Sequence, residues 1–319
     1  MSNDSHLFRT REQLESDGWE LQGNCYVRNG ETYLPLYEDW MVYHFDHRAR
    51  SNGERETTPV QHGDPTFVVL PRYWVKYSDI ESRVAGSTRR HLFPFRNRAR
   101  NTDRRTFIGT CVPFGAAGNV VPLLNMETTN VPWMQAVTSS FAFDYVCRQK
   151  AAGMNLNFFI IKQLPVPTPG DLMRHHLVRD IVLELAYTAW DLWEVAVQLG
   201  YDGPPFRWLE DRRRSLRAEL DAMMFHVYGI ERDDVEYIME TFPIVKEHDI
   251  VEFGEYQTKA LILERYEAIA EARAAGCSYE TLLDPPPAHP SLAHPESTRP
   301  AWARAASISE WQESGVRAS

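Results

Sequence analysis

Four side chains that could do chemistry lie together in one short segment of the chain. The segment YHFDHR, which begins at Tyr43, contains His44, Asp46, His47 and Arg48. Imidazole and carboxylate groups are common metal ligands. In an extended segment, however, alternate side chains point to opposite faces, so the two histidines need not converge on one ion. We therefore predict no metal site and expect structural or interfacial residues here, with a functional site as the alternative.

Basic and amide side chains form a second, larger group. Ten Lys and Arg lie between Arg72 and Arg105, against three acidic residues. Arginine binds phosphate and pairs with guanine, and asparagine pairs with adenine, so this composition predicts a DNA-contact surface. A solvated surface loop is the alternative. The predicted DNA-binding residues are Arg89, Arg90, Arg96, Asn97, Arg98, Arg100, Asn101, Arg104, Arg105, Arg148 and Lys150.

The motifs of several enzyme classes are missing from the sequence. There is no GxxxxGK followed by Ser or Thr, and no GxSxG, HExxH or GxGxxG, so phosphate-loop, serine hydrolase, zincin and dinucleotide-binding enzymes lack support. An amino-methyltransferase acting on DNA needs Asn or Asp, two prolines and an aromatic residue to grip a flipped base. The nearest match, DPPP at Asp284, lacks the aromatic and lies in a Pro-rich tail. We predict no catalytic residue in this chain.

Composition describes a globular chain whose charge is unevenly distributed. The 319 residues are 43% hydrophobic and carry a net charge of -10. Residues 71–165 hold thirteen Lys and Arg against five Asp and Glu, whereas both flanks are acidic, and a localised basic segment is typical of nucleic-acid binding. The four cysteines are far apart and no apolar run is long enough to span a membrane. These features predict a soluble, cytoplasmic protein without disulfides or membrane contact.

Residue patterns predict an α+β protein in four parts. Residues 1–65 form a linker segment with short strand-like runs. Residues 66–167 form a domain with a twisted β-sheet, which includes strands at Phe67–Val75 and Arg105–Val112, a helix from Pro132 to Gly153, and a final strand LNFFII. Residues 171–276 form a helical domain with four helices. Residues 284–319 form a Pro-rich, flexible tail.

Four long segments resemble the C-terminal half of adenine-specific DNA methyltransferases. They start with PLYEDWMVYHFDHR at Pro35, RNTDRRTFIG at Arg100, SSFAFDYVCRQK at Ser139 and RAELDAMMFHVYG at Arg217. The family comprises type IIG restriction-modification enzymes and the related methylases of BREX- and DISARM-type phage defence. The segments occur in the family's order and cover nearly all of residues 25–270.

The resemblance implies that DNA recognition and catalysis belong to different parts of the enzyme. In that family this half contains the target recognition domain, here 66–167, which reads double-stranded DNA, followed by a helical region. The S-adenosylmethionine loop and the Asn-Pro-Pro-aromatic motif precede this half. The resemblance therefore implies that this chain binds no cofactor and that S-adenosylmethionine belongs to a catalytic domain or subunit on another chain. We expect a sequence-specific DNA recognition module of an adenine-N6 methyltransferase that is not catalytic alone.

Other functions remain open at this stage. The chain could be a protein-docking subunit, or a truncated remnant of such a methyltransferase, without independent DNA affinity. The segment HFDHR, which starts at His44, and the apolar helix faces would then form the interface. A self-sufficient enzyme would require a catalytic centre that the sequence does not reveal.

Overall fold

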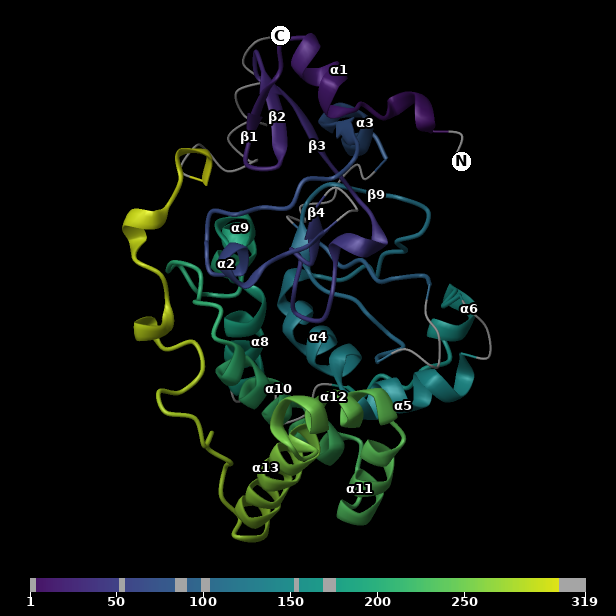
Figure 1. Ribbon diagram of the computed structural model, residues 1–319, viewed down its shortest axis with the longest axis vertical. Helices are drawn as coiled ribbons and strands as arrows, with labels where there is room; N and C mark the ends of the chain where they lie inside the picture. The colour runs from purple at the N-terminus through teal and green to yellow at the C-terminus, as the bar shows by residue number, and fades with distance from the viewer. Residues whose placement is uncertain are drawn as a thin grey trace.

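The computed structural model describes residues 4–51, 55–83, 91–98, 104–151, 155–168 and 176–303. A small antiparallel sheet forms the N-terminal part, and helices form the opposite end of the molecule (Figure 1). The predicted α+β class is therefore confirmed. No helix in the described part of the chain has the length and apolar character needed to cross a bilayer.

The strands are short and most belong to one sheet. Its order is β1-β2-β3-β6, all antiparallel, and β9 pairs with β3 in parallel. The strands are β1 (Glu20–Gln22), β2 (Cys25–Arg28), β3 (Glu31–Tyr37), β4 (Arg50–Ser51), β5 (Arg55–Glu56), β6 (Trp74–Lys76), β7 (His91–Leu92), β8 (Val112–Pro113) and β9 (Ala116–Ala117).

Helices dominate the chain after the sheet. The helices are α1 (Arg11–Ser16), α2 (Pro59–His62), α3 (Tyr77–Glu81), α4 (Val131–Ser139), α5 (Phe141–Lys150), α6 (Phe158–Ile161), α8 (Leu177–Ala186), α9 (Trp193–Gln198), α10 (Glu210–Val227), α11 (Arg232–Glu240), α12 (Pro243–Phe253) and α13 (Gln257–Ala274). Single 3₁₀ turns are η1 (Ser5–Leu7), η2 (Asp39–Met41), η3 (Thr128–Asn130), η4 (Trp190–Leu192), η5 (Pro290–Leu292), η6 (Glu296–Thr298) and η7 (Ala301–Ala303).

The sheet is formed mainly by the segment that we expected to be a linker. Asn29 and Gly30, both at positive φ, make the tight turn between β2 and β3, which is the turn chemistry that hairpins prefer. Gly115 lies just before β9, and a Cβ atom there would come within 2.7 Å of the Pro35 carbonyl oxygen. Glycine is thus needed for the close approach of β9 to β3.

Two predicted strands are much shorter than expected. Only β6 forms at the end of Phe67–Val75, and only β8 begins at the end of Arg105–Val112. The backbone N–H groups of Thr106 and Phe107 donate to the Asp144 carboxylate at 3.0 and 2.7 Å, so they are not available to a neighbouring strand. A side chain therefore replaces the strand partner that the pattern predicted.

The helices differ from the predictions at three places. Ser140 adopts an extended conformation and its hydroxyl accepts from the Phe143 N–H, so it ends α4 and caps α5 within the predicted single helix. The predicted strand LNFFII contains α6, whose N-cap Asn157 accepts from the Ile160 N–H. Pro243 begins α12, which was not predicted, instead of only ending α11, because proline is favoured in the first turn of a helix.

One hydrophobic core crosses the expected domain boundary. Phe45, Phe95 and Phe107 from the N-terminal half belong to the same cluster of buried residues as α10 and α13. The described part of the tail, residues 284–303, follows the molecular surface (Figure 1). The tail backbone at Leu292 and Ala293 forms hydrogen bonds and a β-bridge with residues 206–207, and Trp302 lies against Gly23.

Candidate functional site

A cavity of about 450 Å³ lies where the predicted YHFDHR segment meets the helices. One wall is formed by Tyr43–Asp46 and by Arg104 and Arg105. The junction of α4 with α5 and the first half of α10 form the floor. The end of α12 and the start of α13 form the opposite wall. This volume falls within the range of about 300–1,000 Å³ that is usual for small-molecule sites.

A tight turn places His44 in the cavity wall. The backbones of Tyr43 and Asp46 bond to each other in both directions, at 2.7 and 3.1 Å. Phe45, between them, has a φ of 54° and inserts its ring into the core. A left-handed conformation in a bulky residue is costly, so core packing must fix this turn.

The His44 imidazole is buried and has no hydrogen-bond partner among the described residues. Only 5% of the residue is exposed, and neither Nδ1 nor Nε2 is bonded. Burial lowers its pKa well below the usual range, and the nearby guanidinium groups of Arg105 and Arg217 lower it further. His44 is therefore a neutral donor and acceptor that faces a positive potential.

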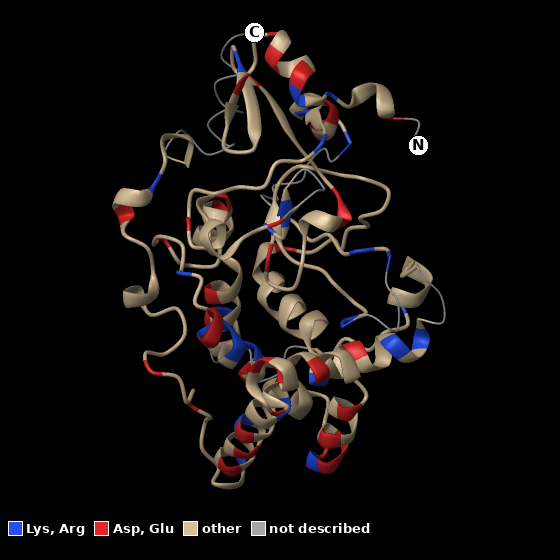
Figure 2. Ribbon diagram, viewed as in Figure 1, with Lys and Arg blue, Asp and Glu red and all other residues tan. Residues whose placement is uncertain are grey.

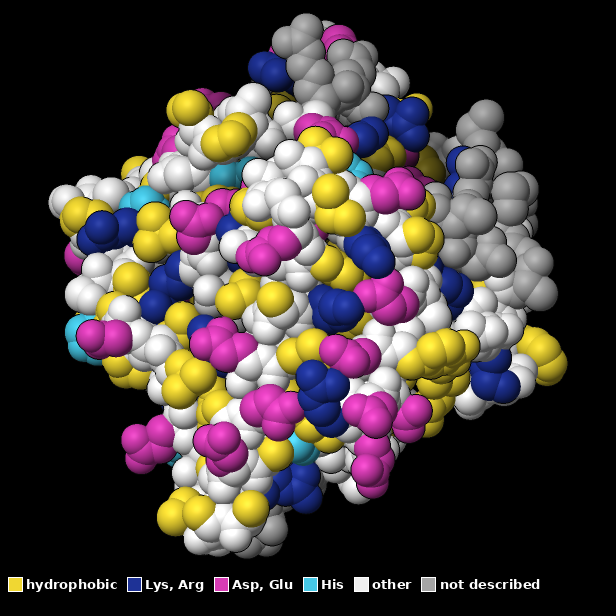
Figure 3. Space-filling view, turned by 60° about the horizontal axis from the view of Figure 1, so that its bottom comes forward, with side chains coloured by type: hydrophobic (Ala, Val, Ile, Leu, Met, Phe, Trp, Pro, Cys, Tyr) yellow, Lys and Arg dark blue, Asp and Glu magenta, His cyan; other side chains and the backbone are white. Residues whose placement is uncertain are grey.

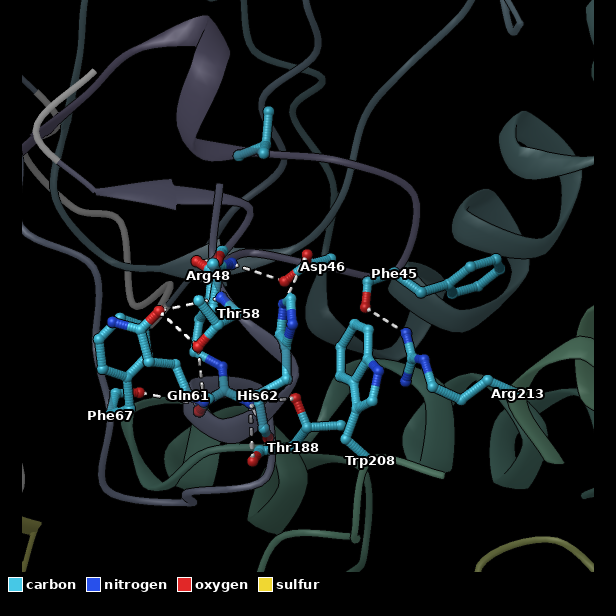
Figure 4. A network of polar contacts seen from close by, with 12 residues as sticks. Phe45, Asp46, Arg48, Thr58, Gln61, His62, Phe67, Thr188, Trp208 and Arg213 are labelled. Carbon is cyan, nitrogen blue, oxygen red and sulfur yellow. Dashed lines mark hydrogen bonds and ion pairs between the residues drawn. The ribbon is translucent and has the colours of Figure 1, made fainter. Parts of the chain in front are cut away.

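Arg213 on α10 is a buried cation without a carboxylate partner in the described part of the chain. It donates to the Leu185 and Phe45 carbonyl oxygens, and its guanidinium lies 3.4 Å from the centre of the Trp208 ring (Figure 4). Burial lowers the pKa of Arg213 to about 9, so it stays charged at neutral pH. The Trp208 indole also stacks on His62, which holds the arginine and the ring in place.

Asp221 is one of two buried carboxylates that the helices contribute to the cavity, while a third, Asp46, lies in the YHFDHR wall. One oxygen accepts from the Phe141 N–H at 2.7 Å, at the start of α5. Burial raises the pKa of Asp221 to about 7, although Arg105 and Arg217 act in the opposite direction. A carboxyl group that titrates near neutral pH in a cavity is typical of functional sites.

Asp249 is the second buried carboxylate, and it lies on the α12 wall. It is 4% exposed, and its Oδ2 accepts from the Thr258 N–H at 2.6 Å, near the start of α13. Beside it, Glu252 forms a 3.3 Å ion pair with Arg214 of α10. Acidic groups thus predominate on this wall.

The rest of the YHFDHR segment has structural contacts. Fully buried Arg48 donates to the carbonyl oxygens of Asp64, Phe67, His62 and Thr188 at 2.9 to 3.2 Å, as Figure 4 shows. A group with so many internal partners holds the loop after α2 against the turn before η4.

The two histidines of the segment, His44 and His47, have different contacts. The His44 ring nitrogens have no partner among the described residues. His47 bonds to Asp191 at 2.8 Å, whereas Asp46, at the cavity wall, pairs with His62 at 3.1 Å. Among the described residues, no group of three His, Cys, Asp or Glu side chains could hold a metal ion.

Three of the predicted DNA-binding arginines have internal partners. Arg96 donates to the Val42 carbonyl oxygen at 2.6 and 3.0 Å. Arg105 pairs with Asp144 at 3.2 Å and lies over the Phe141 ring. Arg148 donates to the Thr106 hydroxyl and the Thr241 carbonyl, and its guanidinium lies over the Phe242 ring.

Other predicted residues are exposed or fall outside the described residues. Arg98, Arg104 and Lys150 are exposed. The side-chain oxygen of Asn97 is buried without a partner in the described structure. Four predicted residues, Arg89, Arg90, Arg100 and Asn101, lie outside the described residues.

Sequence reasoning missed the contribution of α10 to the cavity. Arg213, Arg217 and Asp221 follow each other at intervals of four residues and line the cavity together. That spacing places charged groups on one face of a helix. The signal in the sequence is that the charged run at Arg212–Arg214 continues at this spacing into an otherwise apolar segment.

Comparison with protein-family models, curated proteins and solved structures found no match to this chain.

Proposed function

We propose that this chain is the DNA recognition module of an adenine-N6 methyltransferase in a restriction-modification or phage-defence system. It binds double-stranded DNA in the cytoplasm, and a catalytic domain or subunit on another chain binds S-adenosylmethionine and transfers the methyl group. Two lines of reasoning support the proposal. One is the resemblance of four sequence segments to that family, and the other is a group of exposed cations in the third of these segments and just before the second.

The observation that carries the proposal is a basic edge, which we define as Arg98, Lys150 and Lys162. All three are exposed, and none has a carboxylate partner among the described residues. Arg98 pairs by backbone with Asn155, Lys150 ends α5, and Lys162 follows α6. Figure 2 marks basic residues in blue at the C-terminal end of α5. Cations without internal partners can release counterions when they bind phosphates.

Exposed aromatic rings lie next to the basic edge. On α6, Phe158 is 44% and Phe159 is 77% exposed, and the Phe158 ring contacts Phe95. Aromatic rings beside cations are common where proteins hold nucleic acid, because bases stack on them or sugars pack against them. We propose that α6 lies against the DNA and that the basic edge contacts its phosphates.

Substitution of the basic edge tests this proposal. The triple variant R98A/K150A/K162A should bind duplex DNA more weakly, and its logarithmic salt dependence should be shallower by about one unit for each lost phosphate contact. A variant with the same charge change on the helical end, R232A/K246A/K259A, is the matched control because those cations already pair with carboxylates. Equal salt slopes in both variants would contradict the proposal.

The alternative is a docking subunit, and one observation favours it. Tyr237 of α11 is 62% exposed and Val251 of α12 is 89% exposed, so apolar side chains at the helical end are accessible to a partner protein. Figure 3 shows apolar side chains among interspersed acidic and basic ones on the helical end. A stoichiometric complex with a methyltransferase chain that shows no DNA affinity in either component would favour this alternative.

A further inference from the structure

The lining of the cavity contains positive groups and polar groups without a partner, which come from the YHFDHR segment, from Arg104 and from α10. His44 offers two unbonded ring nitrogens, 95% of the residue being buried. Arg104, at the rim, is exposed and has no carboxylate partner among the described residues. Arg217 pairs with Glu210 at 3.1 Å, yet a third of its side chain is exposed at the cavity. Asp46, also in the lining, lies 3.1 Å from the His62 ring nitrogen.

Arg213 adds a buried positive charge that forms no ion pair with a carboxylate among the described residues, and Asp46 and Glu210 act on it only from a greater distance. Arg213 is 2% exposed, its Nε has no partner, and its other nitrogens reach only carbonyl oxygens. An uncompensated buried cation is costly, and a bound anion would remove that cost. Planar guanidinium groups also match the geometry of phosphate oxygens.

Two buried carboxylates add acidic groups to the lining of the cavity, Asp221 from α10 and Asp249 from α12. Asp221 and Asp249 are 6% and 4% exposed, and in each one carboxylate oxygen accepts from a backbone N–H. Their second oxygens have no hydrogen-bond partner within the described structure. Carboxylate oxygens are the groups that accept from exocyclic amines of nucleobases.

Size and stacking surfaces point to a ligand larger than phosphate alone. The cavity measures about 450 Å³. Three of its arginines lie over aromatic rings at 3.4 to 4.3 Å: Arg105 over Phe141, Arg213 over Trp208 and Arg214 over Phe253. Guanidinium planes that are held in this way are pre-organised, and nucleobases stack on such planes.

We propose that this cavity binds a nucleotide with an amino-bearing base. The phosphate lies against His44, Arg104 and Arg217, and the base lies on the floor with its exocyclic amine near Asp221 and Asp249. The nucleotide is either free in solution or part of a DNA strand, since both present the same phosphate and base.

Calorimetric titration of the purified full chain tests this proposal. The ligands are AMP, CMP, UMP, inorganic phosphate and a single-stranded oligonucleotide. The variants R217M and R104M remove cations at the cavity, and R104M changes an exposed side chain that folding does not need. R232M is the matched control, because Arg232 is exposed on α11 and does not line the cavity. Thermal melts confirm that each variant is folded.

We expect AMP and CMP to bind more tightly than UMP or phosphate, and both cavity variants to weaken AMP binding by at least about tenfold. R232M should bind like the wild type. If only the oligonucleotide binds, and R217M weakens it, the nucleotide comes from a DNA strand. Absent binding, binding that neither cavity variant changes, or phosphate binding as tight as AMP binding would overturn the proposal.

The result is separable from DNA recognition by the basic edge. K150A changes a residue that does not line the cavity, so it should leave AMP binding unchanged while it weakens duplex binding. Nucleotide binding with no duplex binding in the wild type would support the cavity and contradict the recognition module.

Discussion

The carboxyl group of Asp221 is held in an environment that does not favour its charge. Burial raises its pKa to about 7, even though Arg105 and Arg217 lie nearby. Its ordinary value in an unfolded chain is about 4. The folded protein therefore binds more protons than the unfolded chain between these values, and its stability falls as the pH rises from about 4 to 7.

Substitution of this carboxyl should consequently stabilise the protein at high pH. In Asp221→Asn the amide oxygen can still accept from the Phe141 N–H, but no buried charge forms. We expect the free energy of unfolding to rise by about 2 to 4 kcal/mol at pH 8 and to change little at pH 4.

Urea denaturation of both proteins at pH 4 and pH 8 measures the difference. The exposed Asp211 of α10 provides the control, because Asp211→Asn should alter stability only slightly at either pH. A gain for D221N that is equal at both pH values would show that burial does not raise the pKa of Asp221.

At the level of elements, the Asp144 side chain connects helix α5 to the segment that carries Arg104 and Arg105. It is fully buried and accepts from the backbone of Thr106 and Phe107 while it pairs with Arg105. The position of the segment Arg104–Phe107, which contributes Arg104 and Arg105 to the cavity wall, therefore depends on the Asp144 carboxylate.

The variant Asp144→Asn should be strongly destabilised. An amide has one oxygen in place of two, so its NH₂ group would face N–H donors and leave at least one of them unpaired. We expect a loss of about 2 to 4 kcal/mol in the free energy of unfolding. Chemical denaturation at pH 7 measures it against D211N, and equal stability of the two variants would contradict this role.

The same element shows why helices were easier to predict than strands. Apolar residues at helical spacing predicted α10, α11 and α13, and Gly229 and Gly276, both at positive φ, mark the ends of α10 and α13. These signals lie in or next to the helices themselves. The strand expected at Arg105–Val112 required a partner strand. Instead, the Asp144 carboxylate accepts hydrogen bonds from the backbone N–H groups of Thr106 and Phe107. Whether a strand finds a partner depends on residues far away in the sequence, so the residues of the strand itself do not reveal it.

Only part of the candidate site could be predicted for a related reason. The segment from His44 to Arg48 was recognisable because its chemical groups are adjacent in sequence. The cavity also needs Asp221, about 170 positions later, and only folding brings the two together. Conversely, the composition of the basic segment does not reveal that Arg96, Arg105 and Arg148 have internal partners.

For the whole molecule, the charge distribution matters more than the net charge of -10. Acidic residues outnumber basic ones on α11 and α12, in the helical part of the molecule away from the sheet (Figure 2). The basic edge lies beside α5 and α6. DNA at the basic edge would thus be kept away from the acidic helices by repulsion, which fixes the orientation of binding.

Selection from a random duplex pool tests the central proposal of DNA recognition most directly. The purified chain is incubated with the pool at two salt concentrations, and the bound fraction is sequenced, with R98A/K150A/K162A in parallel. We predict salt-sensitive binding and an enriched sequence for the wild type, with both lost or reduced in the variant. Absence of binding by the wild type, or equal enrichment by the variant, would contradict the account.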